Sequence, residues 1–174
     1  TGSIAMGVAD MPSGTYNNGI TVSFADPVPA LATIYYTLDG TEPTISSMPY
    51  TAPIDIDAVD NQEVILKAKA FLDGWIESPT STYSYLFRAA DVNFDPAGGT
   101  YTEVQYVTLS SATEDAEIYY TMDGSAPTEE STLYAGPITV ATNTVIRARA
   151  YNGVYLASPI TSATYAIDLS QFVV

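Results

Sequence analysis

A stretch of eleven residues occurs twice in this chain, and the repeat constrains the fold more than any other feature. Residues 34–44 are Ile-Tyr-Tyr-Thr-Leu-Asp-Gly-Thr-Glu-Pro-Thr, and residues 118–128 are Ile-Tyr-Tyr-Thr-Met-Asp-Gly-Ser-Ala-Pro-Thr. Eight of the eleven positions are identical, at an offset of 84 residues. Because a close internal repeat indicates two copies of one structural unit, we expect two domains, each of roughly 80 residues, which is enough for a modest core.

Matching segments on both sides extend this repeat to nearly the whole chain. Pro-Gly turns open both copies, at residues 12–16 and 96–101, and Tyr-x-x-Pro-Ile follows the motif at residues 50–54 and 134–138. We place the first repeat at residues 9–88 and the second at residues 91–168. The copies differ by four residues, because the first carries a longer, acidic stretch before its next strand.

Hydrophobic residues alternate with polar ones in most segments of each copy. Ile20, Val22 and Phe24 alternate with Thr21 and Ser23. A period of two with β-branched residues favours strands that bury one face. Short strands separated by Gly and Pro are typical of an antiparallel β-sandwich, and we expect no helix longer than one turn.

Charge and composition exclude several functions. The net charge is −15, with five basic residues, so nucleic acid and anionic lipid are poor partners. Cysteine and histidine are absent, which excludes disulfides, the usual zinc sites and a Ser-His-Asp triad. No apolar run is long enough to span a membrane. We expect a soluble monomer.

The two ends of the sequence suggest a part of a longer protein. Residues 1–7 partly resemble an expression scar, no signal peptide is visible, and residues 170–174 have the composition of a strand that is cut short.

Several of these motifs together resemble a known family. They are the pattern Ile-Tyr-Tyr-Thr-[Leu/Met]-Asp-Gly-x-x-Pro-Thr, the Tyr-x-x-Pro-Ile segments, and the closing Tyr85 and Tyr165. Each half resembles the C-terminal domain family of chitobiase and β-hexosaminidase. The resemblance implies two tandem antiparallel sandwiches of the Ig-like or fibronectin-III-like type, acting as a non-catalytic accessory or spacer module of a secreted or cell-surface bacterial protein. It supplies no catalytic residues.

Aromatic residues in a loop offer an alternative function. Trp75 is the single tryptophan, it follows Asp-Gly in an expected hairpin loop, and Tyr155 occupies its place in the second copy. Exposed loop aromatics bind sugar rings or protein partners, which would make the chain a carbohydrate-binding module. The alternative is that both rings only cover the end of a sandwich.

The acidic stretch of the first copy suggests a calcium site. Asp55, Asp57, Asp60 and Glu63 lie within nine residues, and clustered carboxylates suit Ca²⁺. Their spacing fits no EF-hand, and a solvated acidic turn is the commoner explanation. Apart from this calcium hypothesis we expect no cofactor.

The remaining repeated side chains have structural explanations. Ten of the 14 tyrosines form five equivalent pairs, which suits packing. Lys67 and Lys69, like Arg147 and Arg149, are spaced by two and should lie on the solvent face of a strand beside carboxylates. Asp39 and Asp123 lie in turns, so we expect no glycosidase-type acid pair and no enzymatic activity. The expected partners are neighbouring domains and, in the alternative, a polysaccharide.

Overall fold

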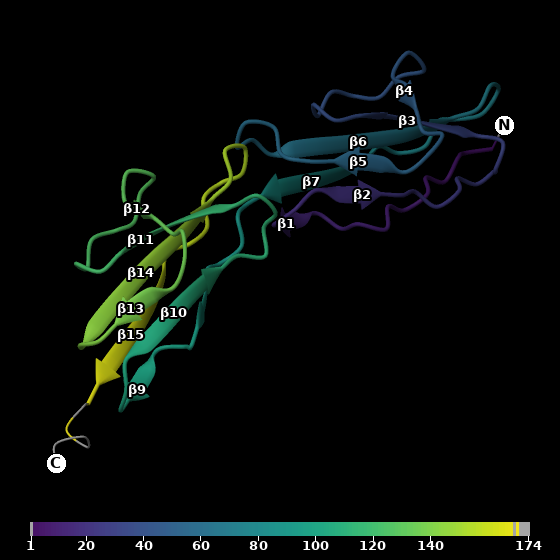
Figure 1. The fold of residues 1–174 in the computed structure, drawn as a ribbon. Coiled ribbons are helices and arrows are strands. Elements are labelled where there is room, and N and C mark those ends of the chain that lie inside the picture. The colour runs from purple at the N-terminus through teal and green to yellow at the C-terminus, as the bar shows by residue number, and fades with distance from the viewer. Residues whose placement is uncertain (1, 169, 171–174) are drawn as a thin grey trace. The chain divides into compact units, whose positions relative to one another are not determined.

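The computed structural model describes residues 2–168 and 170, and these residues form fifteen β-strands and no α-helix. They divide into two compact units, the first ending at Phe87 and the second beginning at Arg88. The colours of Figure 1 run from purple to teal in one unit and from teal to yellow in the other, so the units are consecutive and exchange no strands. The predicted all-β fold is confirmed. The strand expected at residues 170–174 lies outside the described residues, except for Ser170.

Each unit contains a five-stranded sheet with the same strand order. In the first unit the order is β1 (Gly14–Tyr16), β7 (Ser81–Phe87), β6 (Val64–Phe71), β3 (Thr33–Thr37) and β4 (Met48–Pro49). In the second it is β9 (Gly99–Tyr101), β15 (Thr161–Ile167), β14 (Thr144–Tyr151), β11 (Glu117–Thr121) and β12 (Thr132–Leu133).

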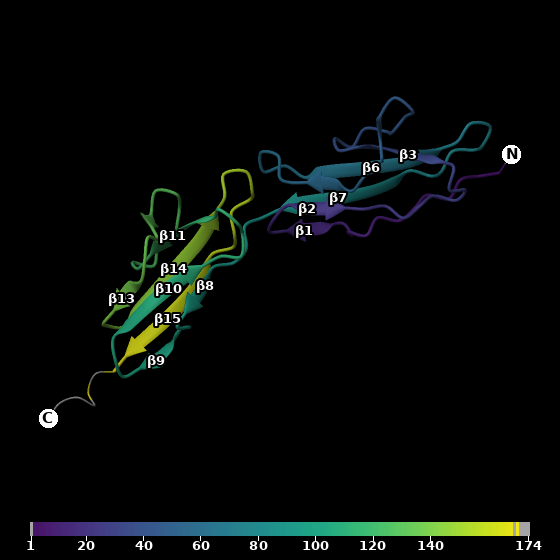
Figure 2. The same ribbon diagram turned by 45° about the vertical axis from the view of Figure 1, so that its right-hand side comes forward.

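A smaller sheet forms the other layer of each unit. In the second unit it contains β8 (Asn93–Asp95), β10 (Gln105–Ser110) and β13 (Ile138–Val140), with β8 beside β10 (Figure 2). In the first unit it contains β2 (Ile20–Val22) and β5 (Ile54–Ile56), and an isolated bridge between Ala9 and Phe24 corresponds to the β8–β10 pair.

The register is identical in the two copies of the repeated motif. Tyr35 lies opposite Lys69 in the β3–β6 pair, and Tyr119 lies opposite Arg149 in the β11–β14 pair. One feature differs from the expected antiparallel arrangement: β1 pairs with β7, and β9 with β15, in parallel. The opening turns therefore lead into short strands that close the edge of the large sheet.

The alternation in the sequence becomes a buried and an exposed face of each strand. Ile146, Ala148 and Ala150 of β14 pack in one cluster with Val107 and Leu109 of β10, so the second unit's core lies between its two sheets. The first unit buries the corresponding residues Leu66, Ala68, Ala70, Val22 and Phe24. Such burial is the main stabilising contribution in a domain of this size.

Residues before the first repeat also belong to the fold. Ile4 is 2% exposed, and its backbone N–H donates to the carbonyl of Ile76 at 3.0 Å. Ala89 does the same in the second unit, donating to Leu156 at 2.8 Å. The segment that resembled an expression scar therefore contributes a core side chain to the first unit.

Candidate functional site

The loop after β6 places Trp75 at one end of the first unit. Gly74 has a φ of +76°, which glycine adopts without a steric penalty, and the N–H of Trp75 donates to the carbonyl of Leu72 at 3.0 Å. The N–H of Ile76 then donates to the carbonyl of Gly2 at 3.0 Å. These hydrogen bonds fix the loop on the end of strand β6.

Gly2 also fixes the ring of Trp75. A Cβ on Gly2 would lie 2.3 Å from the indole ring, so only glycine allows the backbone to approach it so closely. The side chain nevertheless remains 43% exposed. One part of the indole is therefore held against the protein, and another part is accessible to solvent.

The exposed part of Trp75 contributes to a hollow of about 730 Å³. We call it the Trp75 hollow; its apolar lining residues are Leu31, Tyr35, Ile45, Phe71, Trp75 and Ile76. Thr33, Asp73 and Glu77 add polar groups. Tyr35 and Phe71 meet edge to face, with ring centroids 5.7 Å apart, which is a favourable aromatic geometry.

Lys69 connects the aromatic and acidic parts of this region. Its Nζ lies 2.7 Å from a carboxylate oxygen of Glu77 and 5.7 Å from the ring centroid of Phe71. The ion pair orients the carboxylate of Glu77, and the cation–π contact orients the ring of Phe71. The hollow thus combines apolar walls with one carboxylate, that of Glu77, held in place by an ion pair.

Tyr155 does not share the exposure of Trp75. It is 8% exposed, although its N–H donates to the carbonyl of Asn152 as that of Trp75 does to Leu72. The loop backbone thus makes the same hydrogen bond in both units, but the ring is accessible in Trp75 and buried in Tyr155. Trp75 keeps its accessible face.

Three acids of the calcium hypothesis, Asp55, Asp57 and Glu63, line one hollow, but they are not arranged as a metal site. Among residues 2–168 and 170, no three Asp, Glu, His or Cys side chains are placed to hold a metal ion. Asp55 accepts a hydrogen bond from the hydroxyl of Thr21 at 2.7 Å, and Asp57 accepts one from the N–H of Ala58 at 2.7 Å. Asp60, with a φ of +46°, forms part of a turn closed by the Val59–Gln62 bridge. Asp tolerates this left-handed geometry better than most residues.

A second hollow, of about 920 Å³, lies beside that acidic turn. Asp39, Asp55, Asp57 and Met48 are among its lining residues. Asp39 accepts from the N–H of Thr41 at 3.0 Å and from its hydroxyl at 2.6 Å. The carboxylates of Asp39, Asp55 and Asp57 thus each hold local backbone or side chains in place.

Two repeated acids and two repeated tyrosines make matching hydrogen bonds in the two units. Asp123 accepts from the N–H and hydroxyl of Ser125, as Asp39 does from Thr41, and these hydrogen bonds lower the pKa of both carboxyls. Tyr85 and Tyr165 are fully buried and donate to the carbonyls of Met11 and Pro96. The structural interpretation of these side chains is confirmed.

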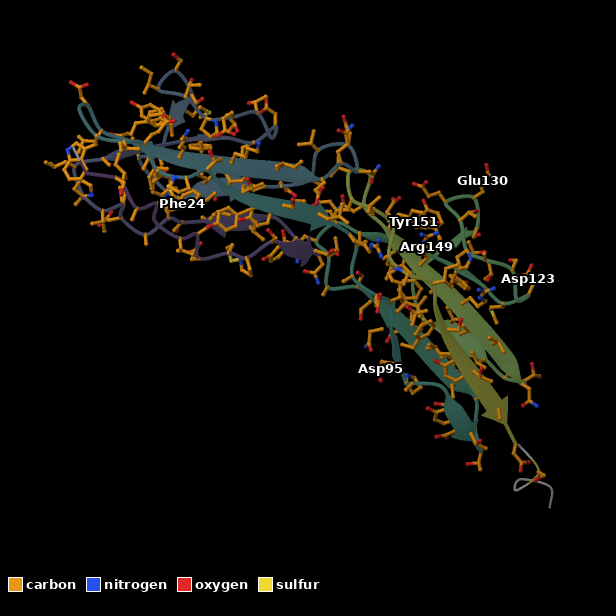
Figure 3. The ribbon with its side chains drawn as sticks, turned by 180° about the vertical axis from the view of Figure 1, so that it is seen from behind. Phe24, Asp95, Asp123, Glu130, Arg149 and Tyr151 are labelled. Carbon is orange, nitrogen blue, oxygen red and sulfur yellow. The ribbon has the colours of Figure 1, made fainter. Side chains whose placement is uncertain are left out.

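The outer face of the large sheets carries the four cations predicted there, Lys67, Lys69, Arg147 and Arg149. Lys67 pairs with Glu42 at 3.5 Å. The arginines differ, because Arg147 donates to the carbonyl of Gly124 and Arg149 to that of Ser158, both at 2.7 Å. Figure 3 shows Arg149 beside Tyr151 on β14, where its guanidinium lies 5.5 Å from the ring centroid. These cations thus bind carbonyls, a carboxylate and a ring of their own units.

Two solved structures match most of this chain at low sequence identity. The fibronectin(III)-like modules of CbhA from Clostridium thermocellum are 16% identical, with a TM-score of 0.34, and the match covers 98% of this chain and 97% of that one. Sidekick-1 immunoglobulin domains 1–5 match at 12% identity and a TM-score of 0.41, covering 95% of this chain and 39% of theirs. At these TM-scores the likeness supports no functional conclusion. Among curated proteins, none matches the sequence.

A family model matches the chain twice. Its description is chitobiase/β-hexosaminidase C-terminal domain, and the matches cover residues 11–83 and 96–162. Each match falls within one unit. In the residues that the structure describes, no helix is both long and apolar enough to cross a membrane.

Proposed function

Because the chain belongs to the chitobiase/β-hexosaminidase C-terminal domain family, with one match in each unit, we propose that it is a non-catalytic accessory segment of a longer protein. The family description itself refers to a domain appended to glycosidases. The segment would space, present or stabilise a neighbouring catalytic or adhesive domain. We place the parent protein outside the cell or on the surface of a bacterium, where polysaccharide substrates are found.

The observation that carries this proposal is the use of the repeated polar side chains. Asp39 and Asp123 accept hydrogen bonds within their own turns, and Tyr85 and Tyr165 donate to backbone carbonyls. A glycosidase needs two carboxyl groups that face each other across a cleft. The side chains that the two copies share therefore stabilise the fold of each unit. A stable fold without a catalytic acid pair is what a spacer requires.

The test is a search for turnover with the purified chain. We expect no hydrolysis of chitin-, cellulose- and hexosaminide-type substrates, and a monomer by light scattering. Asp39→Asn with Asp123→Asn is the matched control for any trace of activity. Hydrolysis by the native chain that the double variant loses would overturn the non-catalytic proposal. A melting temperature that responds to millimolar Ca²⁺ would add a cofactor to it.

Carbohydrate binding is the second candidate function, and one observation favours it. The Trp75 hollow is lined by aromatic and aliphatic side chains together with polar groups, a combination that small-ligand sites use. Of the two loop aromatics considered, Trp75 is accessible, at 43% exposure, and Tyr155 is buried. A binding role would therefore belong to the first unit.

A further inference from the structure

We propose that the Trp75 hollow is a binding site for a neutral glycan chain, and that the second unit is its non-binding scaffold copy. This inference rests on the proposed accessory role, since a glycan site on an appended segment would hold the parent protein on a polysaccharide. The inference specifies where the ligand binds, which class of ligand it is, and that only the first unit binds it.

Several apolar side chains that line the hollow are exposed. The exposed fractions are 82% for Leu31, 69% for Ile45, 62% for Ile76 and 43% for Trp75. A cluster of exposed apolar side chains, unlike single ones, marks a binding surface. The C–H faces of sugar rings pack on such aromatic and aliphatic walls.

The polar groups of the hollow select the chemistry of the ligand. Asp73 and Glu77 are hydrogen-bond acceptors, and Thr33 both donates and accepts. Glu77 is held by Lys69 at 2.7 Å, so its carboxylate is fixed before a ligand arrives. Carboxylates on a chain of net charge −15 repel phosphate, sulfate and uronate groups. Neutral hydroxyl groups are the complementary partners.

The second unit provides an internal comparison, because the same fold carries different side chains there. Asp115 stands at the position of Leu31, and Glu129 at that of Ile45. Both lie at the repeat offset of 84, and both are exposed. Stability alone does not require the apolar residues, since the second unit has the same strand order with acids in these places.

The loop aromatic and its acidic neighbour differ as well. Tyr155, at the position of Trp75, is 8% exposed, and Ala157 replaces Glu77. Four features of the hollow are thus missing together from the second copy. Their joint presence in the first unit indicates a role specific to that unit.

The size of the hollow favours an oligosaccharide over a protein. Its volume of about 730 Å³ lies in the range of roughly 300–1,000 Å³ typical of small-ligand sites. A stable protein interface needs about 800 Å² from each partner, which a single hollow does not supply. We therefore assign the site to a few consecutive sugar residues.

The experiment uses the whole chain and a panel of neutral polysaccharides in affinity gel electrophoresis. The panel contains glycol chitin, hydroxyethyl cellulose, xyloglucan and galactomannan, with an acidic polysaccharide, polygalacturonate, for comparison. We expect retardation by at least one neutral polymer and none by the acidic one. Trp75 is the single tryptophan, so the same ligand should also shift its fluorescence emission.

Three variants locate the site. Trp75→Ala should weaken retardation about tenfold or more, as loss of a central anchor does. Leu31→Asp with Ile45→Glu introduces the second unit's own residues at exposed positions, so it should keep the fold and lose most of the binding. Tyr106→Ala removes a 63% exposed aromatic of the second unit and should bind as the native chain does.

The contrary results are equally clear. Native-like retardation of both hollow variants, loss of binding in Tyr106→Ala, or no retardation and no fluorescence change across the panel would each overturn the proposal. Binding of a protein but of no glycan would also overturn it. None of these results would be evidence for enzymatic activity. The non-catalytic accessory role is tested separately, by the turnover assay.

Discussion

Ser78 and Ala70 are joined by two hydrogen bonds inside the first unit. The N–H of Ser78 donates to the carbonyl of Ala70 at 3.0 Å, and the N–H of Ala70 donates to the Oγ of Ser78 at 2.9 Å. Ser158 and Ala150 repeat the pair, with both distances at 2.9 Å. Pairing of β6 with β7 ends at Ala68, and pairing of β14 with β15 ends at Ala148. The two serines, which are buried, therefore supply the hydrogen-bond partners that the neighbouring strand no longer provides.

Ser78→Ala should destabilise the first unit by about 1–3 kcal/mol, because it leaves the buried N–H of Ala70 without its acceptor. Urea unfolding followed by the fluorescence of Trp75 measures this unit. Ser158→Ala is the matched variant of the second unit and should lower the stability seen by circular dichroism. If both variants unfolded at the same urea concentration as the native chain, this role of the serines would be contradicted.

The left-handed glycines of the repeated turn provide a second matched pair. Gly40 has a φ of +76° and Gly124 a φ of +85°, so alanine is strained at both positions. A Cβ at Gly40 would lie 3.3 Å from Ile65, whereas at Gly124 nothing lies within 4 Å. Both alanine variants should lose about 1 kcal/mol or more, and Gly40→Ala should lose the larger amount. Equal losses in urea unfolding would show that the contact with Ile65 relaxes.

The fold was predictable because its determinants are local. Period-two alternation places Leu66, Ala68 and Ala70 on one face, and the Asp-Gly dipeptides mark turns, so strands and turns follow from neighbouring residues. The repeat strengthens each prediction, because a pattern that occurs at the same place in both copies rarely arises by chance. The parallel pairing of β1 with β7 was missed, because it depends on how distant segments meet.

The candidate site was only partly predictable for the same reason. Trp75 was identifiable as a lone loop aromatic, but Leu31 and Ile45 come from other loops, and spacing in the sequence does not show that they meet it. The burial of Tyr155 also depends on tertiary packing. One usable signal was overlooked: apolar residues of the first copy, such as Ile45, align with acids such as Glu129 in the second.

Asp39 and Asp123 should contribute to the acid dependence of stability. Hydrogen bonds from the hydroxyls and N–H groups of Thr41 and Ser125 lower the pKa of both carboxyls below the ordinary value of 3.8. A lowered folded-state pKa means that the stabilisation is fully present above pH 3.8 and is lost as the pH falls below it.

The double variant Asp39→Asn with Asp123→Asn tests this, since asparagine keeps an acceptor oxygen and does not titrate. Its free energy of unfolding should fall less steeply than that of the native chain between pH 4 and pH 2. An identical slope in urea titrations at each pH would exclude these two carboxyls as the source.

Tyr85 and Tyr165 should limit stability at high pH. Burial raises the pKa of each phenol from 10.0 to about 12. The unfolded chain therefore releases these protons first, so the stabilisation is complete below pH 10 and is lost as the pH rises towards 12. Tyr85→Phe should cost about 1 kcal/mol at pH 7, because the hydrogen bond to Met11 is removed. It should also make stability fall less steeply above pH 10. Tyr106→Phe, at an exposed position, is the control and should follow the native curve; a native alkaline slope in Tyr85→Phe would show that the buried phenol is not responsible.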